Sequence, residues 1–157
     1  MNNRIVIFGA SGYLGSHLCE RLIAMGKTNI VAVARNEGNL VSLKEKYQCI
    51  EVIVGDISDR WIVKKAMKDA DEVFLLSALK HVGLAEIEVK SCITTNIIGC
   101  MNVIDESLIT KPKVLMFIST DKASQPMGVY GCSKKIGEKL ISVFLRFGLV
   151  NVNFSSF

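Results

Sequence analysis

Short apolar runs alternate with amphipathic stretches along the whole of this 157-residue chain. The apolar runs are rich in Val, Ile and Leu and show no strict alternation of apolar and polar residues. Such runs are typical of strands buried on both faces, as in a parallel sheet. Regular alternation of strands and helices predicts right-handed crossovers, so the expected fold class is α/β, with a doubly wound parallel sheet.

The predicted elements form a single domain over residues 1–157. Strands are expected at 4–9, 29–34, 49–56, 71–78, 113–120 and 150–157, and helices at 13–25, 37–47, 59–68, 86–108 and 130–147. The last run resembles the opening of a sixth strand with no helix after it, and it is expected at an exposed edge. Either the domain is complete and minimal, or it is a piece of a longer protein truncated after the start of this strand. The second interpretation is favoured.

The composition argues against several classes of protein. Hydrophobic residues make up 50% of the chain and charged residues 22%, which favours a packed core over disorder. The net charge of +4 is spread out without a dense basic stripe, so we expect no nucleic-acid partner. No apolar run reaches the ~18–20 residues that span a bilayer, so no membrane segment is expected.

The five cysteines are scattered and form no CxxC pair. Their odd number and spacing argue against a disulfide framework and against a zinc site, so we expect no metal centre. The sequence also has no signal-like start. We therefore expect a reducing, cytoplasmic location.

The stretch FGASGYLGSHL places Gly9, Gly12 and Gly15 between the first predicted strand and the first predicted helix. In a dinucleotide-binding fold the first glycine permits a tight turn, the second lets the backbone approach a pyrophosphate, and the third lets the helix pack close to the strand. The helix N-terminus offers amide hydrogens and a partial positive charge to the phosphates. Because the glycines lie in the required strand–turn–helix context, they predict a dinucleotide site rather than a purely structural turn.

The end of the second strand bears on which dinucleotide is bound. An NAD site typically has an acid there for the ribose 2′-hydroxyl, whereas this chain has Arg35 followed by Asn36. A guanidinium suits a 2′-phosphate through bidentate hydrogen bonds, so we expect NADP, with NAD as the alternative. Asp56, at the end of the third strand, either reaches an adenine amino group or belongs only to the loop. Asp59 is the better candidate for capping the next helix.

Polar residues 119–122 leave the fifth strand at the edge where ligands of doubly wound sheets bind. On the following helix, Tyr130 and Lys134 lie four residues apart and so share one face. A phenol has a pKa near 10, which a nearby ammonium lowers. The pair is therefore suited to removing a hydroxyl proton while hydride leaves the same carbon. The alternative is a Tyr packed at the helix start and a solvated Lys.

Several stretches together resemble the extended short-chain dehydrogenase/reductases. They are GASGYLG (9–15), SALKHV (77–82), TNIIGCMNVID (95–105), ISTDKA (118–123) and YGCSK (130–134). Within that superfamily the chain is similar to the N-terminal part of the nucleotide-sugar 4,6-dehydratases of polysaccharide biosynthesis, especially the inverting UDP-N-acetylglucosamine 4,6-dehydratases. The stretches ALKHV and STDKA distinguish this group from generic epimerases and dehydratases.

The resemblance implies a Rossmann-like NAD(P)-binding domain and a dehydratase reaction. Tyr130, poised by Lys134, would take the proton of the sugar's C4 hydroxyl as hydride passes to NADP+. Water would then leave across C5 and C6, and hydride would return to C6. Lys122 is expected as the C5 base and Asp121 as the C6 acid, with the reverse assignment open, and Thr120 is expected to hold the sugar.

The resemblance also implies which residues contact the cofactor: Gly9, Ser11, Gly12, Tyr13, Leu14, Gly15, Arg35, Asp56, Ile57, Ala78, Lys80, Asn96, Tyr130 and Lys134. The family's C-terminal domain, which grips the nucleotide sugar, is not expected within these residues. Family members commonly form homo-oligomers through helices flanking the sheet. The alternatives are a non-catalytic dinucleotide-binding module and another sugar-nucleotide epimerase or reductase, including a simple ketoreductase.

Overall fold

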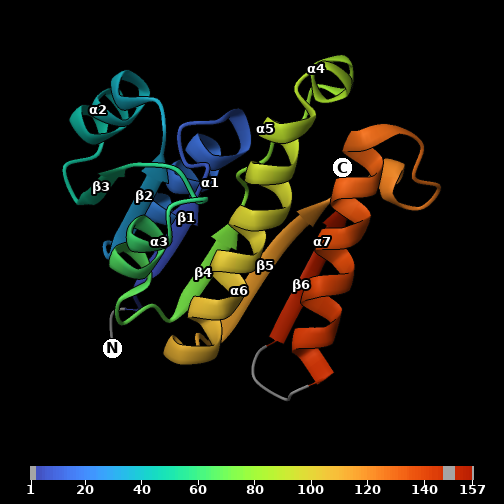
Figure 1. Cartoon of the computed structure of the whole chain (residues 1–157). Coiled ribbons are helices and arrows are strands. Elements are labelled where there is room, and N and C mark those ends of the chain that lie inside the picture. The colour runs from blue at the N-terminus through green and yellow to red at the C-terminus, as the bar shows by residue number, and fades with distance from the viewer. Residues whose placement is uncertain (1–2, 147–150, 157) are drawn as a thin grey trace.

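A computed structural model describes residues 3–146 and 151–156 of the chain. At its centre is a sheet in the order β3-β2-β1-β4-β5-β6, in which every neighbouring pair is parallel (Figure 1). The strands are β1 (Ile5–Phe8), β2 (Ile30–Ala34), β3 (Ile50–Val54), β4 (Glu72–Leu75), β5 (Val114–Ser119) and β6 (Asn151–Ser156). The predicted doubly wound α/β fold is confirmed, and β6 lies at an edge of the sheet as expected.

Helices cover both faces of the sheet (Figure 1). On one face lie α1 (Tyr13–Ala24) and α2 (Glu37–Lys46), and on the other lie α3 (Arg60–Met67), α6 (Gly99–Thr110) and α7 (Gly128–Arg146). These five helices begin and end within a few residues of the predicted bounds, except that α6 is only the last part of the helix predicted at 86–108.

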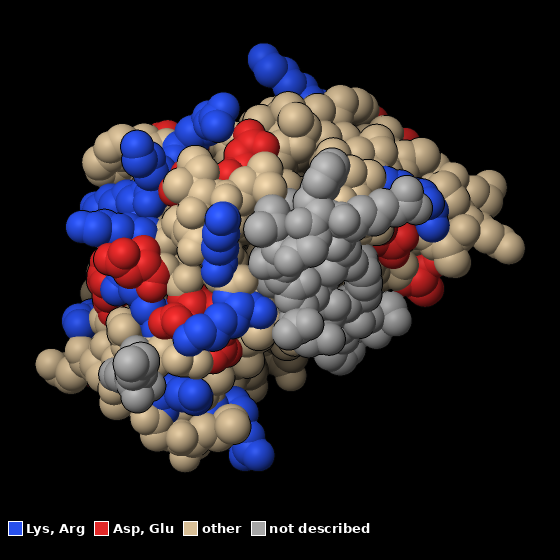
Figure 2. Space-filling view, turned by 90° about the horizontal axis from the view of Figure 1, so that it is seen from below, with Lys and Arg blue, Asp and Glu red and all other residues tan. Residues whose placement is uncertain are grey.

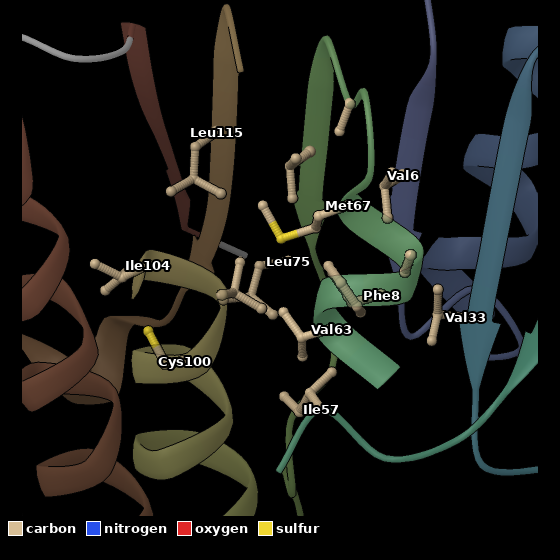
Figure 3. Close-up of a cluster of buried hydrophobic side chains, with 14 of the residues drawn as sticks. Val6, Phe8, Val33, Ile57, Val63, Met67, Leu75, Cys100, Ile104 and Leu115 are labelled. Carbon is tan, nitrogen blue, oxygen red and sulfur yellow. The ribbon is translucent and has the colours of Figure 1, made fainter. Parts of the chain in front are cut away.

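The core is divided by the sheet into two apolar layers. Strand β1 lies at the middle of the sheet and all its side chains are buried, with Ile5 and Ile7 facing α1 and α2. Val6 and Phe8 face the opposite layer, where they pack with side chains of α3 and α6 such as Val63 (Figure 3). The continuous apolar run of β1 is thus explained by burial on both faces.

The helix predicted at 86–108 is wrong in detail. The chain forms α4 (Val82–Ile87), breaks at Glu88, and continues through α5 (Val89–Ile93), a π-helical turn η1 (Thr94–Ile98) and then α6. The backbone at Glu88 has φ −98° and ψ 53°, which lies outside the helical range. In the π-turn, Asn96 bonds to two distant segments, so tertiary contacts set the local geometry here.

The strand predicted at 71–78 ends early, at Leu75. Beyond it, the backbone at Ser77 packs against the turn at Gly9, where a Cβ on the glycine would lie 2.7 Å from the Ser77 nitrogen. Residues 76–81 form a loop at the carboxyl end of β4 instead of the last part of the predicted strand.

Seen from below in the orientation of Figure 1, the surface carries Lys and Arg side chains interspersed with Asp and Glu (Figure 2). The short helix η2 (Asp121–Ala123) directly follows β5 and so lies at the carboxyl ends of the strands. Among the helices in the described ranges, none combines the length and the apolar character that a membrane crossing needs.

Candidate dinucleotide-binding site

The strand order reverses between β1 and β4, and ligands of doubly wound sheets bind beyond the carboxyl ends of the strands at such a point. A cavity of about 600 Å³ lies there. Its lining comes from the loops after β1 to β5, from η1 and from α7: Gly9, Ser11, Gly12, Tyr13, Leu14, Gly15, Ala34, Arg35, Asn36, Gly55, Asp56, Ile57, Leu76, Ser77, Ala78, Lys80, Thr95, Ile118, Ser119, Thr120, Tyr130 and Lys134.

The glycine turn forms the wall of this cavity next to β1. Gly9 has φ +86°, a conformation that favours glycine. A Cβ on Gly15 would lie 2.3 Å from the Gly9 carbonyl oxygen, so only glycine lets α1 start this close to the strand. Helix α1 is preceded by Gly12, has no side-chain cap and carries no acidic residue in its first turn. Its first amide hydrogens are thus available to a phosphate.

Arg35 and Asp56 form an ion pair in another part of the cavity wall. The Arg35 Nη1 and the Asp56 Oδ2 are 3.4 Å apart, and the Arg35 side chain is 65% exposed. The other carboxylate oxygen of Asp56 accepts a hydrogen bond from the backbone N–H of Ser58 at 2.8 Å. The guanidinium is therefore held beside the loop after β3, with donors still directed to solvent.

Tyr130 and Lys134 are both buried on the first turns of α7 and both line the cavity. The Lys134 ammonium donates to the Ile118 carbonyl and lies 4.4 Å from the centre of the Phe117 ring. Burial lowers the pKa of Lys134 from 10.5 to about 8, although the nearby Cys100 and Glu138 act in the opposite direction. Tyr130 and Lys134 lie four residues apart on α7, so their side chains share one face of the helix.

Asn96 connects the loop after β4 with the helix that carries the tyrosine. Its side chain accepts from the Leu79 N–H at 2.8 Å and donates to the Leu79 carbonyl at 3.0 Å. It also donates to the Ser133 hydroxyl at 2.9 Å, which in turn donates to the Tyr130 carbonyl at 2.7 Å. Asn96 is buried behind the cavity wall, so these bonds fix the positions of two lining segments.

Asp121 and Lys122 lie in η2, directly after the lining residue Thr120. The Thr120 hydroxyl donates to Asp121 Oδ1 at 3.0 Å, and the Lys122 ammonium is 3.6 Å from the same oxygen. The hydrogen bond from Thr120, followed by the charge of Lys122, lowers the pKa of Asp121 below its ordinary value. Both side chains are exposed.

The cavity brings together most of the residues predicted from the sequence. Asn96, Asp121 and Lys122 are the predicted site residues that do not line it. Lining residues that the sequence did not assign to the site are Ala34, Asn36, Gly55, Leu76, Ser77, Thr95, Ile118 and Ser119. Apart from Thr95, these lie at or just beyond the carboxyl ends of strands, so strand position is the signal that identifies them.

The fold, the glycine turn and the cavity together define a Rossmann-like domain of the short-chain dehydrogenase/reductase type. Residues 5–152 match the polysaccharide biosynthesis protein family, and the chain belongs to that family. It is 34% identical over 139 residues to the inverting UDP-N-acetylglucosamine 4,6-dehydratase of Campylobacter jejuni, with 87% of this chain and 42% of the relative covered. It is 32% identical over 150 residues to a UDP-glucose 4-epimerase of Rickettsia bellii, with 89% and 43% covered.

The chain thus spans about two fifths of the length of these curated relatives. Among solved structures it resembles that of DesIV, a dTDP-glucose 4,6-dehydratase from Streptomyces venezuelae crystallised with NAD bound. The TM-score is 0.86 at 18% identity, with 98% of this chain and 55% of the other covered. This likeness supports the fold.

Burial of Lys134 predicts a pH-dependent cost to stability. In the fold the pKa of Lys134 is about 8, below the ordinary value of 10.5 that applies in the unfolded chain. The buried ammonium therefore destabilises the folded state below pH 8. The cost is relieved as the pH rises from 8 to 10.5. We predict that Lys134→Met raises the free energy of unfolding by about 1–3 kcal/mol at pH 7, and that this gain shrinks towards pH 10.

Urea denaturation of both proteins from pH 7 to 10 measures this difference. Lys90→Met, at an exposed position on α5, is the matched control and should show no such trend. A gain for Lys134→Met that stays constant over this range of pH contradicts the predicted protonation effect.

Proposed function

We propose that this chain is the cofactor-binding part of a cytoplasmic nucleotide-sugar 4,6-dehydratase that uses NADP and acts on a UDP-N-acetylglucosamine-like sugar. The observation that carries the proposal is the placement of Tyr130 and Lys134 in the same cavity as the glycine turn, with Asp121 and Lys122 next to its lining. The similarity to the dehydratase of Campylobacter jejuni supports the choice of reaction.

The dinucleotide is expected to lie with its pyrophosphate at the turn 9–15 and its adenosine end beside the Arg35–Asp56 ion pair. The exposed guanidinium of Arg35 favours a 2′-phosphate and hence NADP, while NAD is the alternative. The further contacts proposed on the strength of the family resemblance are Ile57, Ala78 and Lys80, with Asn96 behind them. Bound there, the cofactor supplies a hydride acceptor and donor.

Tyr130 is proposed to remove the proton of the C4 hydroxyl. A phenol is a weak base at neutral pH, so it needs a neighbouring positive charge to favour its phenolate. Lys134 is proposed to supply this charge, because a group whose pKa is about 8 is still largely an ammonium at pH 7. Both side chains are largely buried in the cavity wall.

Lys122 is proposed as the base that removes the C5 proton and Asp121 as the acid that protonates the leaving C6 hydroxyl, with Thr120 holding the sugar. In the free chain the hydrogen bond from Thr120 lowers the pKa of Asp121 and keeps it ionised. Its role as an acid therefore requires that bound substrate bury the carboxyl and raise its pKa. The reverse assignment, with Asp121 as the base, needs no such change.

Two other functions are distinguished by simple measurements. A non-catalytic dinucleotide-binding module would bind NADP+ without converting any sugar. An epimerase, such as the relative from Rickettsia bellii, would change the configuration of the sugar without loss of water. The exposed Asp121–Lys122 pair favours elimination, because removing a C5 proton and expelling a C6 hydroxyl needs a base and an acid.

Incubation of the chain with UDP-N-acetylglucosamine and NADP+ tests the proposal, with product followed by the loss of one water in its mass. We predict that Lys122→Ala lowers the rate of product formation by at least about 100-fold, because the C5 base is lost. Lys90→Ala, which removes an exposed lysine remote in sequence, is the control and should leave the rate unchanged. Binding of NADP+ without product would leave only a cofactor-binding module.

We also propose that the chain self-associates through α6 and α7. Their outer surfaces form a groove of about 430 Å³ lined mainly by apolar side chains: Ile104, Leu108, Ile136, Leu140 and Val143, with Lys135 and Lys139. Ile136 is 43% exposed and Val143 is 52% exposed, which is a contiguous apolar surface that a second copy of the same helix pair can cover.

Light scattering of the chain at micromolar concentration tests this contact. Val143→Asp is expected to shift the measured mass towards that of a monomer, because a charge is placed within the groove. Ile109→Asp is the control, since Ile109 is 71% exposed but lies outside the groove. A monomeric mass for the unsubstituted chain contradicts the proposal.

A further inference from the structure

A buried asparagine of α6, Asn102, is hydrogen-bonded to the loop after β3. Asn102 is only 7% exposed, and its amide nitrogen donates to the carbonyls of Ile57 and Ser58, each at 2.9 Å. These bonds join residues 45 and 44 positions apart in the sequence. Asn102 itself does not line the cavity, whereas Ile57 does.

A second constraint acts on Ile57 from the same helix. Gly99 lies one turn before Asn102, and a Cβ there would be 2.4 Å from the Ile57 side chain. Ile57 is therefore seated against bare helix backbone, and its own backbone carbonyl is held by the amide of Asn102. The residue is 4% exposed, so both its side chain and its main chain are fixed by α6.

The position of this loop determines where the neighbouring charged groups stand. Asp56 accepts from the backbone N–H of Ser58 through one oxygen and pairs with Arg35 through the other. A continuous series of contacts thus runs from Asn102 through Ser58 and Asp56 to the guanidinium of Arg35. A displacement of the loop would move the carboxylate that holds this guanidinium at the cavity wall.

We propose that Asn102 is a positioning residue for the adenosine end of the dinucleotide. It acts through the loop 56–58, whose backbone it holds so that the Asp56 carboxylate lies 3.4 Å from the guanidinium of Arg35. The inference rests on the part of the proposed function that places a dinucleotide in the cavity, and it is independent of the sugar chemistry. Asn96 anchors the loop after β4 in a similar way, through two hydrogen bonds to the backbone of Leu79.

A purely structural role for Asn102 makes a different prediction. Buried carbonyls need donors, so losing the amide would cost stability in either case. A structural role alone predicts that ligand affinities of the folded protein stay the same. A positioning role predicts a selective loss of affinity for ligands that occupy the adenosine end.

Calorimetric titration of adenosine 2′,5′-bisphosphate, which represents that end alone, and of NADP+ separates the two roles. In Asn102→Asp a carboxylate replaces both donors and faces two carbonyl oxygens. We expect affinity for both ligands to fall about 10- to 50-fold at pH 8. On lowering the pH, protonation restores one donor, so the affinity of this variant should partly recover relative to the unsubstituted chain.

Two variants serve as controls. Asn96→Asp removes the same type of buried amide, here the one that anchors the loop after β4. It should weaken the binding of NADP+ while leaving the affinity for adenosine 2′,5′-bisphosphate within about twofold. Ser107→Ala removes a buried hydrogen bond within α6, to the Val103 carbonyl, and should leave both affinities unchanged. Should Asn102→Asp fail to fold, Asn102→Ala is used in its place, with an expected loss of about 5- to 10-fold.

Unchanged affinity for adenosine 2′,5′-bisphosphate in a folded Asn102 variant overturns the positioning role and leaves the proposed function intact. Equal losses in the Asn102 and Asn96 variants for this ligand also overturn it, because the effect is then not specific to the adenosine end. Binding of neither ligand, and of no NAD+ either, by the unsubstituted chain refutes the dinucleotide site itself, and with it both proposals.

Discussion

The close approach of two backbone segments at the end of β1 is the constraint on which the site depends. Gly15 lies so near the Gly9 carbonyl that a Cβ would be only 2.3 Å from its oxygen. This contact lets α1 begin directly after the short turn 9–12, with its uncapped N-terminus directed to the cavity. Gly9 in turn packs against Ser77, which lines the cavity in the loop after β4. The same glycines therefore shape both sides of the cavity.

The rest of the site is held by buried polar groups, whose burial costs folding free energy unless they are hydrogen-bonded. Lys134 is buried with a pKa lowered to about 8, which is unfavourable for folding at neutral pH. Asn96 and Asn102 are buried on one continuous helical segment, and each anchors a different loop at the cavity. These are features of a site whose geometry is fixed before any ligand binds.

The alternation of strands and helices and the position of the site follow from the sequence because their signals are local. Apolar runs and the glycine turn identify the parallel sheet and the edge where Tyr130 and Thr120 lie. The break at Glu88 and the π-turn carry no such signal, since they depend on bonds between Asn96 and segments distant in the sequence. The anchoring of the β3 loop by Asn102 is unpredictable for the same reason, because its partners are 44 and 45 residues away.

The central claim is that the glycine turn receives the pyrophosphate of a dinucleotide, and titration of NADP+ into three proteins tests it most directly. Gly12 lines the cavity and a Cβ there would meet only the Gly9 carbonyl, at 3.3 Å, whereas a Cβ at Gly83 meets nothing within 4 Å. The account predicts binding by the unsubstituted chain, equal binding by Gly83→Ala, and binding at least about tenfold weaker by Gly12→Ala. Equal affinity in all three, or binding of neither NADP+ nor NAD+ by the unsubstituted chain, would contradict it.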